Sequence, residues 1–127
     1  MKQLPSYMKI SYVALYNYIN EMAYHILKEQ DLDVIEHPMK IWEDIAEAQI
    51  VEARWFHSQY KPTLEEYMEN AYVSVTGPAI STLAYLSAAN PIVEKEVEFI
   101  GNHPPLVKLA SMAFRLQDDL GTATVYI

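Results

Sequence analysis

The middle of the chain reads Pro62-Thr63-Leu64-Glu65-Glu66-Tyr67, and this stretch decides where a central helix begins. Thr63 and Glu66 have the spacing of a capping box, in which each side chain accepts a hydrogen bond from the backbone N–H of the other residue. Pro62 stands just ahead of the cap. The stretch therefore predicts a helix that begins after Thr63, with its first amides satisfied by these side chains.

Helical periodicity extends from this point toward both ends of the chain. Apolar side chains recur at spacings of three and four, which predicts helices over residues 6–29 and from about 38 to 57–60. Beyond the central helix we expect a half-helix over 79–88, a short acidic helix over 92–100 and a final helix after the loop of residues 101–105. The sequence shows no strand pattern that competes with these helical patterns. The predicted fold is therefore all-α, with about five to six helices.

Two of these helices carry apolar stripes that we expect to face the core. In the first helix the stripe is Tyr12, Leu15, Ile19, Met22, Ala23 and Ile26. In the final helix it is Leu106, Leu109, Met112, Ala113, Leu116 and Leu120.

The central helix should break or kink at Gly77-Pro78. Pro78 has no backbone N–H, and its ring clashes with the carbonyl four residues back. Gly77 permits backbone conformations that other residues avoid. A broken helix exposes carbonyl groups, whereas a simple kink would only curve the helix around a core, and both interpretations stay open.

Composition excludes several classes of protein. The 127 residues are enough for one domain, and 51% of them are hydrophobic, which excludes a disordered chain. Apolar runs long enough to span a bilayer are absent, and a net charge of −8 disfavours nucleic acid as a partner. The absence of Cys excludes disulfides and thiolate catalysis, and the histidines lack the spacing of a zinc site. The first residues resemble neither a secretory signal nor a transit peptide.

Near the carboxyl end, Arg115, Asp118 and Thr122 share one face of the predicted final helix. Tyr126 falls on the same stripe. A guanidinium, a carboxylate and a hydroxyl in one row suit Mg2+ bridged to a phosphate, because Mg2+ binds few protein oxygens and leaves its other positions to water and substrate. The alternative is an ordinary surface pair of Arg and Asp.

Three stretches carry a family resemblance. They run from Leu4-Pro5-Ser6-Tyr7-Met8-Lys9 to Tyr16-Asn17-Tyr18-Ile19-Asn20-Glu21, from Val51-Glu52-Ala53-Arg54-Trp55-Phe56-His57 to residues 62–67, and from Arg115 to Thr122. In order and spacing they resemble plant class I terpene synthases, most of all the angiosperm monoterpene synthases. The resemblance covers nearly the whole chain. It implies part of an α-helical barrel in which Mg2+ ions hold the diphosphate of a prenyl substrate and a carbocation rearranges in an apolar pocket.

The resemblance assigns roles to residues near the carboxyl end of the chain. The family's second metal motif falls on Asp118, Thr122 and Tyr126, with Asp119 as a further candidate ligand. Tyr126 departs from the family's Glu, because a phenol with a pKa of about 10 offers the ion no charge. Arg115 stands where the family places an arginine that contacts the diphosphate. The metal implied is Mg2+, with Mn2+ as the alternative.

The same resemblance implies that the helix break faces the substrate. Thr76 and Gly77 are the candidate catalytic residues, since a carbonyl dipole aimed at the substrate can stabilise a passing cation. The family's aspartate-rich metal motif is absent from this chain. Residues 1–127 are therefore expected to be one partial metal-binding domain, without the family's amino-terminal domain and the helices after Thr122.

The expected function is that of a terpene synthase fragment. The complete enzyme would ionise a prenyl diphosphate, which we expect to be geranyl diphosphate, and would form a monoterpene in a plastid. The chain alone is expected to be inactive. One alternative is a non-catalytic helical remnant or interaction module. Another is a bundle that binds divalent cations without a prenyl substrate. We expect neither a nucleic-acid nor a membrane partner, whereas the sequence leaves the oligomeric state open and does not identify the product.

Overall fold

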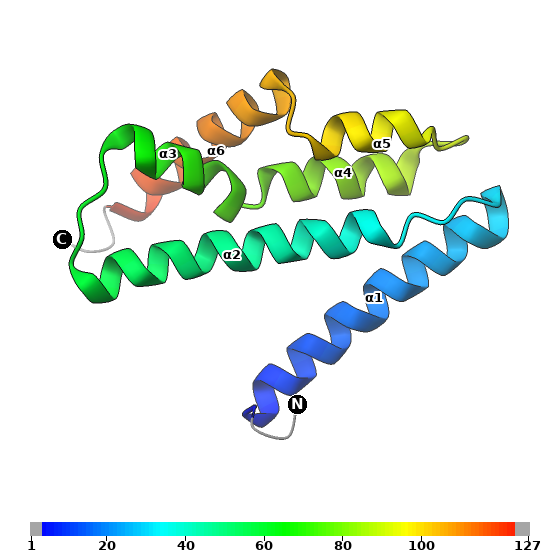
Figure 1. Ribbon diagram of the computed structural model, residues 1–127, viewed down its shortest axis with the longest axis horizontal. Helices are drawn as coiled ribbons and strands as arrows, with labels where there is room; N and C mark the ends of the chain where they lie inside the picture. The colour runs from blue at the N-terminus through cyan, green and yellow to red at the C-terminus, as the bar shows by residue number, and fades with distance from the viewer. Residues whose placement is uncertain (1–3, 124–127) are drawn as a thin grey trace.

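The computed structural model describes residues 4–123, and within them the chain forms six α-helices (Figure 1). These are α1 (Ser6–Gln30), α2 (Glu36–Ser58), α3 (Leu64–Ser74), α4 (Gly77–Ala88), α5 (Glu94–Gly101) and α6 (Pro105–Ala123). The described residues include no strand. The predicted all-α class is confirmed, and so is the predicted order of helices.

The α3–α4 pair lies at the centre of the arrangement. Both helices contact α2 and α6, and α5 packs against α4. Figure 1 shows α1 diverging from α2, with its amino-terminal half well away from the other helices. The neighbourhood of α2, α3 and α6 is therefore where residues distant in sequence meet.

The predicted capping box is present at the start of α3. The Glu66 N–H donates to Thr63 Oγ1 at 3.2 Å, and the Thr63 N–H donates to Glu66 Oε2 at 2.8 Å. The Tyr60 hydroxyl also donates to the Glu66 carboxylate, at 3.1 Å. The backbone bond from Thr63, followed by the bond from Tyr60, lowers the pKa of Glu66. The start of α3 is thus fixed by residues close together in sequence.

The predicted break is also present, but Gly77 plays a different part from the one expected. α3 ends at Ser74 and α4 begins at Gly77. The residue with a left-handed backbone is Thr76, with φ of 70°, and the φ of Gly77 is not positive. A Cβ on Gly77 would lie 2.1 Å from Ser111 Oγ and 3.0 Å from Ser111 Cα. The prediction that Gly77 supplies backbone freedom was wrong, since its lack of a side chain allows α4 to approach α6.

The hydrophobic core lies toward one end of the molecule. It joins the end of α1, the α1–α2 connection, α4 and α5, and its buried members are Ala23, Ile26, Val34, Leu86, Ile92 and Val97. Gln30 ties the same elements together, because its Oε1 accepts from the Ile92 N–H at 2.6 Å and its Nε2 donates to the Ala89 carbonyl at 3.3 Å. The core thus anchors only the second half of α1.

The prediction that α6 turns its large apolar side chains toward the core was wrong for most of them. Leu106 is 81% exposed, Leu109 65%, Leu116 48% and Leu120 74%, whereas Ser111 is buried. The close approach of Ser111 to α4 and the polar contacts of Arg115 and Asp119 farther along α6 select the inward face of this helix.

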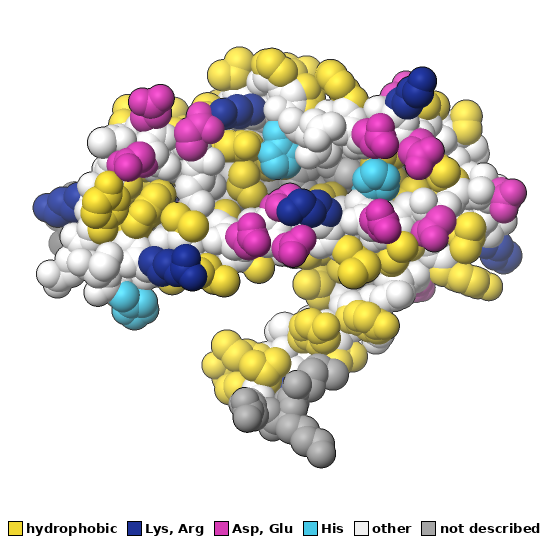
Figure 2. Space-filling model, viewed as in Figure 1, with side chains coloured by type: hydrophobic (Ala, Val, Ile, Leu, Met, Phe, Trp, Pro, Cys, Tyr) yellow, Lys and Arg dark blue, Asp and Glu magenta, His cyan; other side chains and the backbone are white. Residues whose placement is uncertain are grey.

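The first half of α1 is also exposed and apolar. Tyr7 is 66% exposed and Ile10 71%, and Tyr12, which we expected in the core, is 51% exposed. Figure 2 shows hydrophobic side chains covering the projecting arm that α1 forms.

Across residues 4–123, a helix with both the length and the apolar character to cross a membrane is not found.

Candidate functional site

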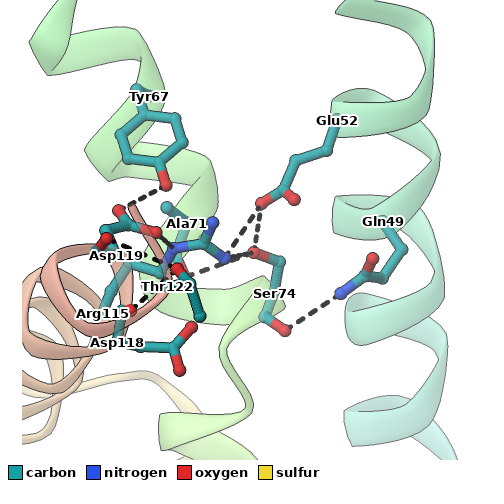
Figure 3. Close-up of polar contacts among 9 residues, drawn as sticks. All are labelled: Gln49, Glu52, Tyr67, Ala71, Ser74, Arg115, Asp118, Asp119 and Thr122. Atoms are coloured by element: carbon teal, nitrogen blue, oxygen red, sulfur yellow. Dashed lines mark hydrogen bonds and ion pairs between the residues drawn. The ribbon is translucent and has the colours of Figure 1, made fainter. Parts of the chain in front are cut away.

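Arg115 lies on α6 where that helix packs against α3, its guanidinium reaches Glu52 on α2, and its side chain is only 18% exposed. Its Nε donates to Asp119 Oδ1 at 2.9 Å, one turn along the helix. Its Nη1 lies 3.6 Å from Glu52 Oε1 on α2 and 3.5 Å from Ser74 Oγ at the end of α3 (Figure 3). The arginine is thus held firmly at Nε and by longer contacts at Nη1.

Tyr67 on α3 completes a polar cluster. The other members of this polar cluster are Arg115, Asp119, Glu52, Ser74 and Gln49. Its hydroxyl donates to Asp119 Oδ2 at 2.6 Å, and the Arg115 guanidinium lies 5.3 Å from the centre of its ring, within the range of a cation–π contact. Burial, and then the hydrogen bond to Asp119, raises the pKa of Tyr67 to about 12. Tyr67 is therefore a neutral donor at physiological pH.

Arg115 keeps its charge in this setting. Burial alone would lower the pKa of the guanidinium, but the influence of Tyr67, Glu52 and Asp119 outweighs it, and the pKa is raised overall. A guanidinium that stays charged and carries planar N–H donors can bind phosphate oxygens. The geometry of Arg115 is compatible with the predicted contact to a diphosphate, which stays a prediction.

The polar cluster is joined to the helix break through Ser74. Pro78 has no N–H to donate to the Ser74 carbonyl four residues back, and Gln49 Nε2 on α2 donates to it instead, at 3.1 Å. The Ser74 hydroxyl donates to Glu52 Oε1. Side chains from α2 thus satisfy both the backbone and the hydroxyl at the end of α3.

The carbonyls of Thr76 and Gly77 both have donors. The Thr76 carbonyl accepts from the Ile80 N–H at 2.9 Å, and the Gly77 carbonyl accepts from Ser81 Oγ at 3.0 Å. The left-handed backbone of Thr76 is uncommon for a β-branched residue, and such conformations gather at functional sites. The catalytic role of Thr76 and Gly77 stays a prediction.

Asp118 and Thr122 lie on α6 beside the cluster but outside its side-chain contacts. Both are exposed, and Thr122 Oγ1 donates to the Asp118 carbonyl at 2.9 Å. In Figure 3 the Asp118 carboxylate lies apart from the contacts between Tyr67, Asp119 and Arg115. The third predicted ligand position, Tyr126, lies outside the described residues.

The chemistry of Asp118 and Thr122 fits a hard divalent cation. A carboxylate and a hydroxyl oxygen one helical turn apart are ligands that Mg2+ accepts, with its other positions left to water or substrate. The proton of the Thr122 hydroxyl points to a carbonyl, so the lone pairs of its oxygen remain available. Residues 4–123 contain no group of three His, Cys, Asp or Glu that could hold a metal ion by itself. Asp119 differs, because both of its oxygens are already hydrogen-bonded.

Three residues of the cluster were missed by reasoning from the sequence: Gln49, Glu52 and Tyr67. Glu52 and Tyr67 fall inside stretches that carry the family resemblance, and this was the signal available. Gln49 and Glu52 are three apart on α2, so they share a face of that helix.

Comparisons with known proteins agree with this fold. The family described as "Terpene synthase family, metal binding domain" matches residues 1–125. An alpha-thujene synthase of Litsea cubeba, named as chloroplastic, is 49% identical over 98% of this chain. A chloroplastic gamma-terpinene synthase of Citrus limon is 45% identical over 97% of the chain. The chain spans 21% of the length of each of these relatives. It belongs to the terpene synthase family and matches the metal-binding domain of that family.

Solved structures give the same result. The isoprene synthase of grey poplar leaves, solved with three Mg2+ ions and dimethylallyl-S-thiolodiphosphate, has a TM-score of 0.91 and 35% identity over 98% of this chain and 24% of its own. A limonene synthase solved with 2-fluorolinalyl diphosphate has a TM-score of 0.88 and 37% identity, over 95% of this chain and 22% of its own. The helical fold predicted from the family resemblance is therefore confirmed.

Proposed function

We propose that this chain is one partial metal-binding domain of a terpene synthase that converts geranyl diphosphate into a monoterpene in a plastid. The main support is the half-buried Arg115, which stays charged beside the α3–α4 break, about one turn from Asp118 and about two turns from Thr122. The names of the relatives, which include chloroplastic thujene and terpinene synthases, favour a monoterpene product.

The proposed chemistry begins with the departure of diphosphate from an allylic carbon. Negative charge then develops on the phosphate oxygens, and a preset positive group lowers the barrier by stabilising it. Arg115 would bind these oxygens through its planar N–H donors. Asp118 and Thr122 would hold Mg2+, or alternatively Mn2+, and such an ion neutralises developing charge when it is bound.

Thr76 and Gly77 would act on the hydrocarbon end of the substrate. Thr76 lies in the break that follows Ser74, and Gly77 is the first residue of α4. The Ser74 hydroxyl lies 3.5 Å from Arg115 Nη1. The proposed diphosphate site would therefore be adjacent to the break. Backbone dipoles at the break would stabilise positive charge on the carbon skeleton after the diphosphate has left.

A second candidate function is that of an interaction module without catalysis. Its support is the exposure of Leu106, Leu109 and Leu120 on α6, which together present an apolar face of the kind that binds other helices. Under both proposals, the purified chain alone should turn over geranyl diphosphate negligibly with Mg2+. Terpene products from the chain alone would contradict this expectation.

Thermal unfolding of the 127-residue chain tests the proposed site. Mg2+ and inorganic pyrophosphate together should raise the Tm, because a ligand that binds the folded state stabilises it by mass action. Arg115→Gln should abolish the part of the shift that needs pyrophosphate, and Asp118→Asn the part that needs Mg2+. Arg54→Gln, at an exposed site on α2, is the matched control for the loss of a guanidinium.

Each alternative gives a different result in the same assay. A bundle that only binds divalent cations would respond to Mg2+ and ignore pyrophosphate. An interaction module without the site would respond to neither ligand, and that result would overturn the proposed function.

A further inference from the structure

We propose that Tyr67 is a positioning residue that acts through Asp119 on Arg115, so that Asp119 orients the candidate diphosphate-binding arginine instead of binding a metal ion. This inference rests on the proposed function, because it assumes that Arg115 meets a diphosphate. It assigns a role to Tyr67, which the sequence did not single out, and a different role to Asp119.

The contacts of Asp119 carry the argument. Its Oδ1 accepts from Arg115 Nε at 2.9 Å, and its Oδ2 accepts from the Tyr67 hydroxyl at 2.6 Å. Two bonds from different helices, one to each oxygen, fix the plane of the carboxylate. A fixed carboxylate in turn fixes the direction of the Arg115 Nε–H bond, and with it the plane of the guanidinium.

The two ends of the guanidinium are held unequally. The Nε contact is short, whereas the Nη1 contacts to Ser74 Oγ and Glu52 Oε1 are 3.5 and 3.6 Å long. A phosphate oxygen can therefore replace the partners at Nη1 while the bond at Nε keeps the plane of the fork in place. Orientation set in advance reduces the loss of side-chain freedom on binding.

The neighbouring acid, Asp118, lacks such contacts. It is exposed, and its carboxylate has no hydrogen bond or ion pair with side chains of residues 4–123. The two adjacent carboxylates thus have different roles. Asp118, with Thr122, is available to bind a cation, whereas Asp119 is hydrogen-bonded to Arg115.

Calorimetric titration of the 127-residue chain separates these roles, with Mg2+ alone and then with inorganic pyrophosphate at saturating Mg2+. Tyr67→Phe should weaken pyrophosphate binding roughly fivefold, the effect of losing one ordinary hydrogen bond. Asp119→Asn should weaken it on the order of tenfold, because the bond it loses is charge-assisted. Neither change should alter the affinity for Mg2+, whereas Asp118→Asn should reduce it.

Tyr60→Phe is the matched control, since it removes another bond between a tyrosine and a carboxylate, to Glu66, outside the cluster. It should leave both affinities unchanged. The inference is overturned if Tyr67→Phe binds pyrophosphate as tightly as the parent chain, or if Asp119→Asn loses Mg2+ affinity in the way that Asp118→Asn does.

If the parent chain does not bind pyrophosphate, that result counts against the proposed function and not against the positioning role of Tyr67. A second measurement then tests the positioning role without pyrophosphate. By NMR, the Nε–H proton of Arg115 should exchange with water more slowly than that of the exposed Arg54, the internal reference. Tyr67→Phe should speed this exchange severalfold, with helix content unchanged by circular dichroism. Unchanged exchange in Tyr67→Phe would overturn the positioning role.

Discussion

Two of the bonds between a tyrosine and a carboxylate within residues 4–123 differ in almost every respect except chemistry. Tyr60 donates to Glu66 at 3.1 Å, across six positions of the chain and in an exposed setting. Tyr67 donates to Asp119 at 2.6 Å, across 52 positions and in a partly buried setting. The first pair completes the cap of α3, and the second joins α3 to α6.

The surroundings of each pair decide what its hydrogen bond contributes to the structure. The Tyr60–Glu66 pair competes with water on all sides, and the short loop between its residues brings them together without help from other helices. The Tyr67–Asp119 pair is partly shielded from water, where electrostatic interactions are stronger, and it exists only while α6 keeps its position. A change in helix packing should therefore break one pair and spare the other.

Gly77→Ala should have the largest effect, because it acts on that packing. The added Cβ would meet Ser111 Oγ at 2.1 Å and Ser111 Cα at 3.0 Å, and a helix backbone cannot yield as a flexible side chain can. We expect the free energy of unfolding to fall by about 2 kcal/mol, the usual cost of overpacking, in urea denaturation. The Tyr67–Asp119 bond should weaken while the capping box at Thr63 stays intact.

Ser111→Gly, added to Gly77→Ala, is the control for this prediction. It removes the side-chain atoms nearest to the new Cβ, so part of the lost stability should return. A Gly77→Ala chain as stable as the parent, or a double variant less stable than the single one, would contradict the proposed close packing of α4 on α6.

Tyr67→Phe should have the next largest effect. It removes the hydroxyl from Asp119 Oδ2 and leaves a partly buried carboxylate oxygen without its donor, which should cost about 1 kcal/mol of stability. Tyr60→Phe removes an exposed hydroxyl and should cost clearly less. Urea denaturation of both variants under one set of conditions measures the difference, and equal losses would refute the role assigned to burial.

The same contrast explains how much of the fold was predictable. The capping box, the break at Gly77-Pro78 and the order of the helices follow from residues within a few positions of one another, and all were predicted. The orientation of α6 was not, because its apolar stripe suggested a core face while the actual inward face carries Ser111 and Arg115. That choice depends on the surface of α4, which periodicity in α6 cannot reveal.

The residues of the candidate site were likewise only partly predictable from the sequence. Arg115, Asp118 and Thr122 were identified by their spacing on one helix and by a family resemblance. Glu52 and Tyr67 were not, because their roles arise from contacts between helices that are distant in sequence. Spacing along α6 grouped Asp118 with Thr122 and left Asp119 as a further candidate ligand, but it could not reveal the bond that Asp119 accepts from the Tyr67 hydroxyl on α3.

The smallest expected effect concerns pH and the exposed pair. The backbone bond from Thr63 and then the bond from Tyr60 lower the pKa of folded Glu66 below its ordinary value of 4.5. The ionised carboxylate is therefore favoured by folding, so its contribution is fully present above pH 4.5 and is lost as the pH falls through the lower, folded pKa. We expect the difference in stability between the parent chain and Glu66→Gln to be largest near pH 6 and to shrink toward pH 3.

Comparing the parent chain with Glu66→Gln by urea denaturation cancels the titration of the other carboxylates, which both chains share. Tyr60→Phe should reduce the pH-dependent difference without abolishing it, because the Thr63 bond, the larger cause, remains. A difference that is constant from pH 6 to pH 3 would mean that the cap does not favour the ionised form. Tyr67→Phe, which does not touch Glu66, should leave this difference unchanged if the local pair is independent of the long-range one.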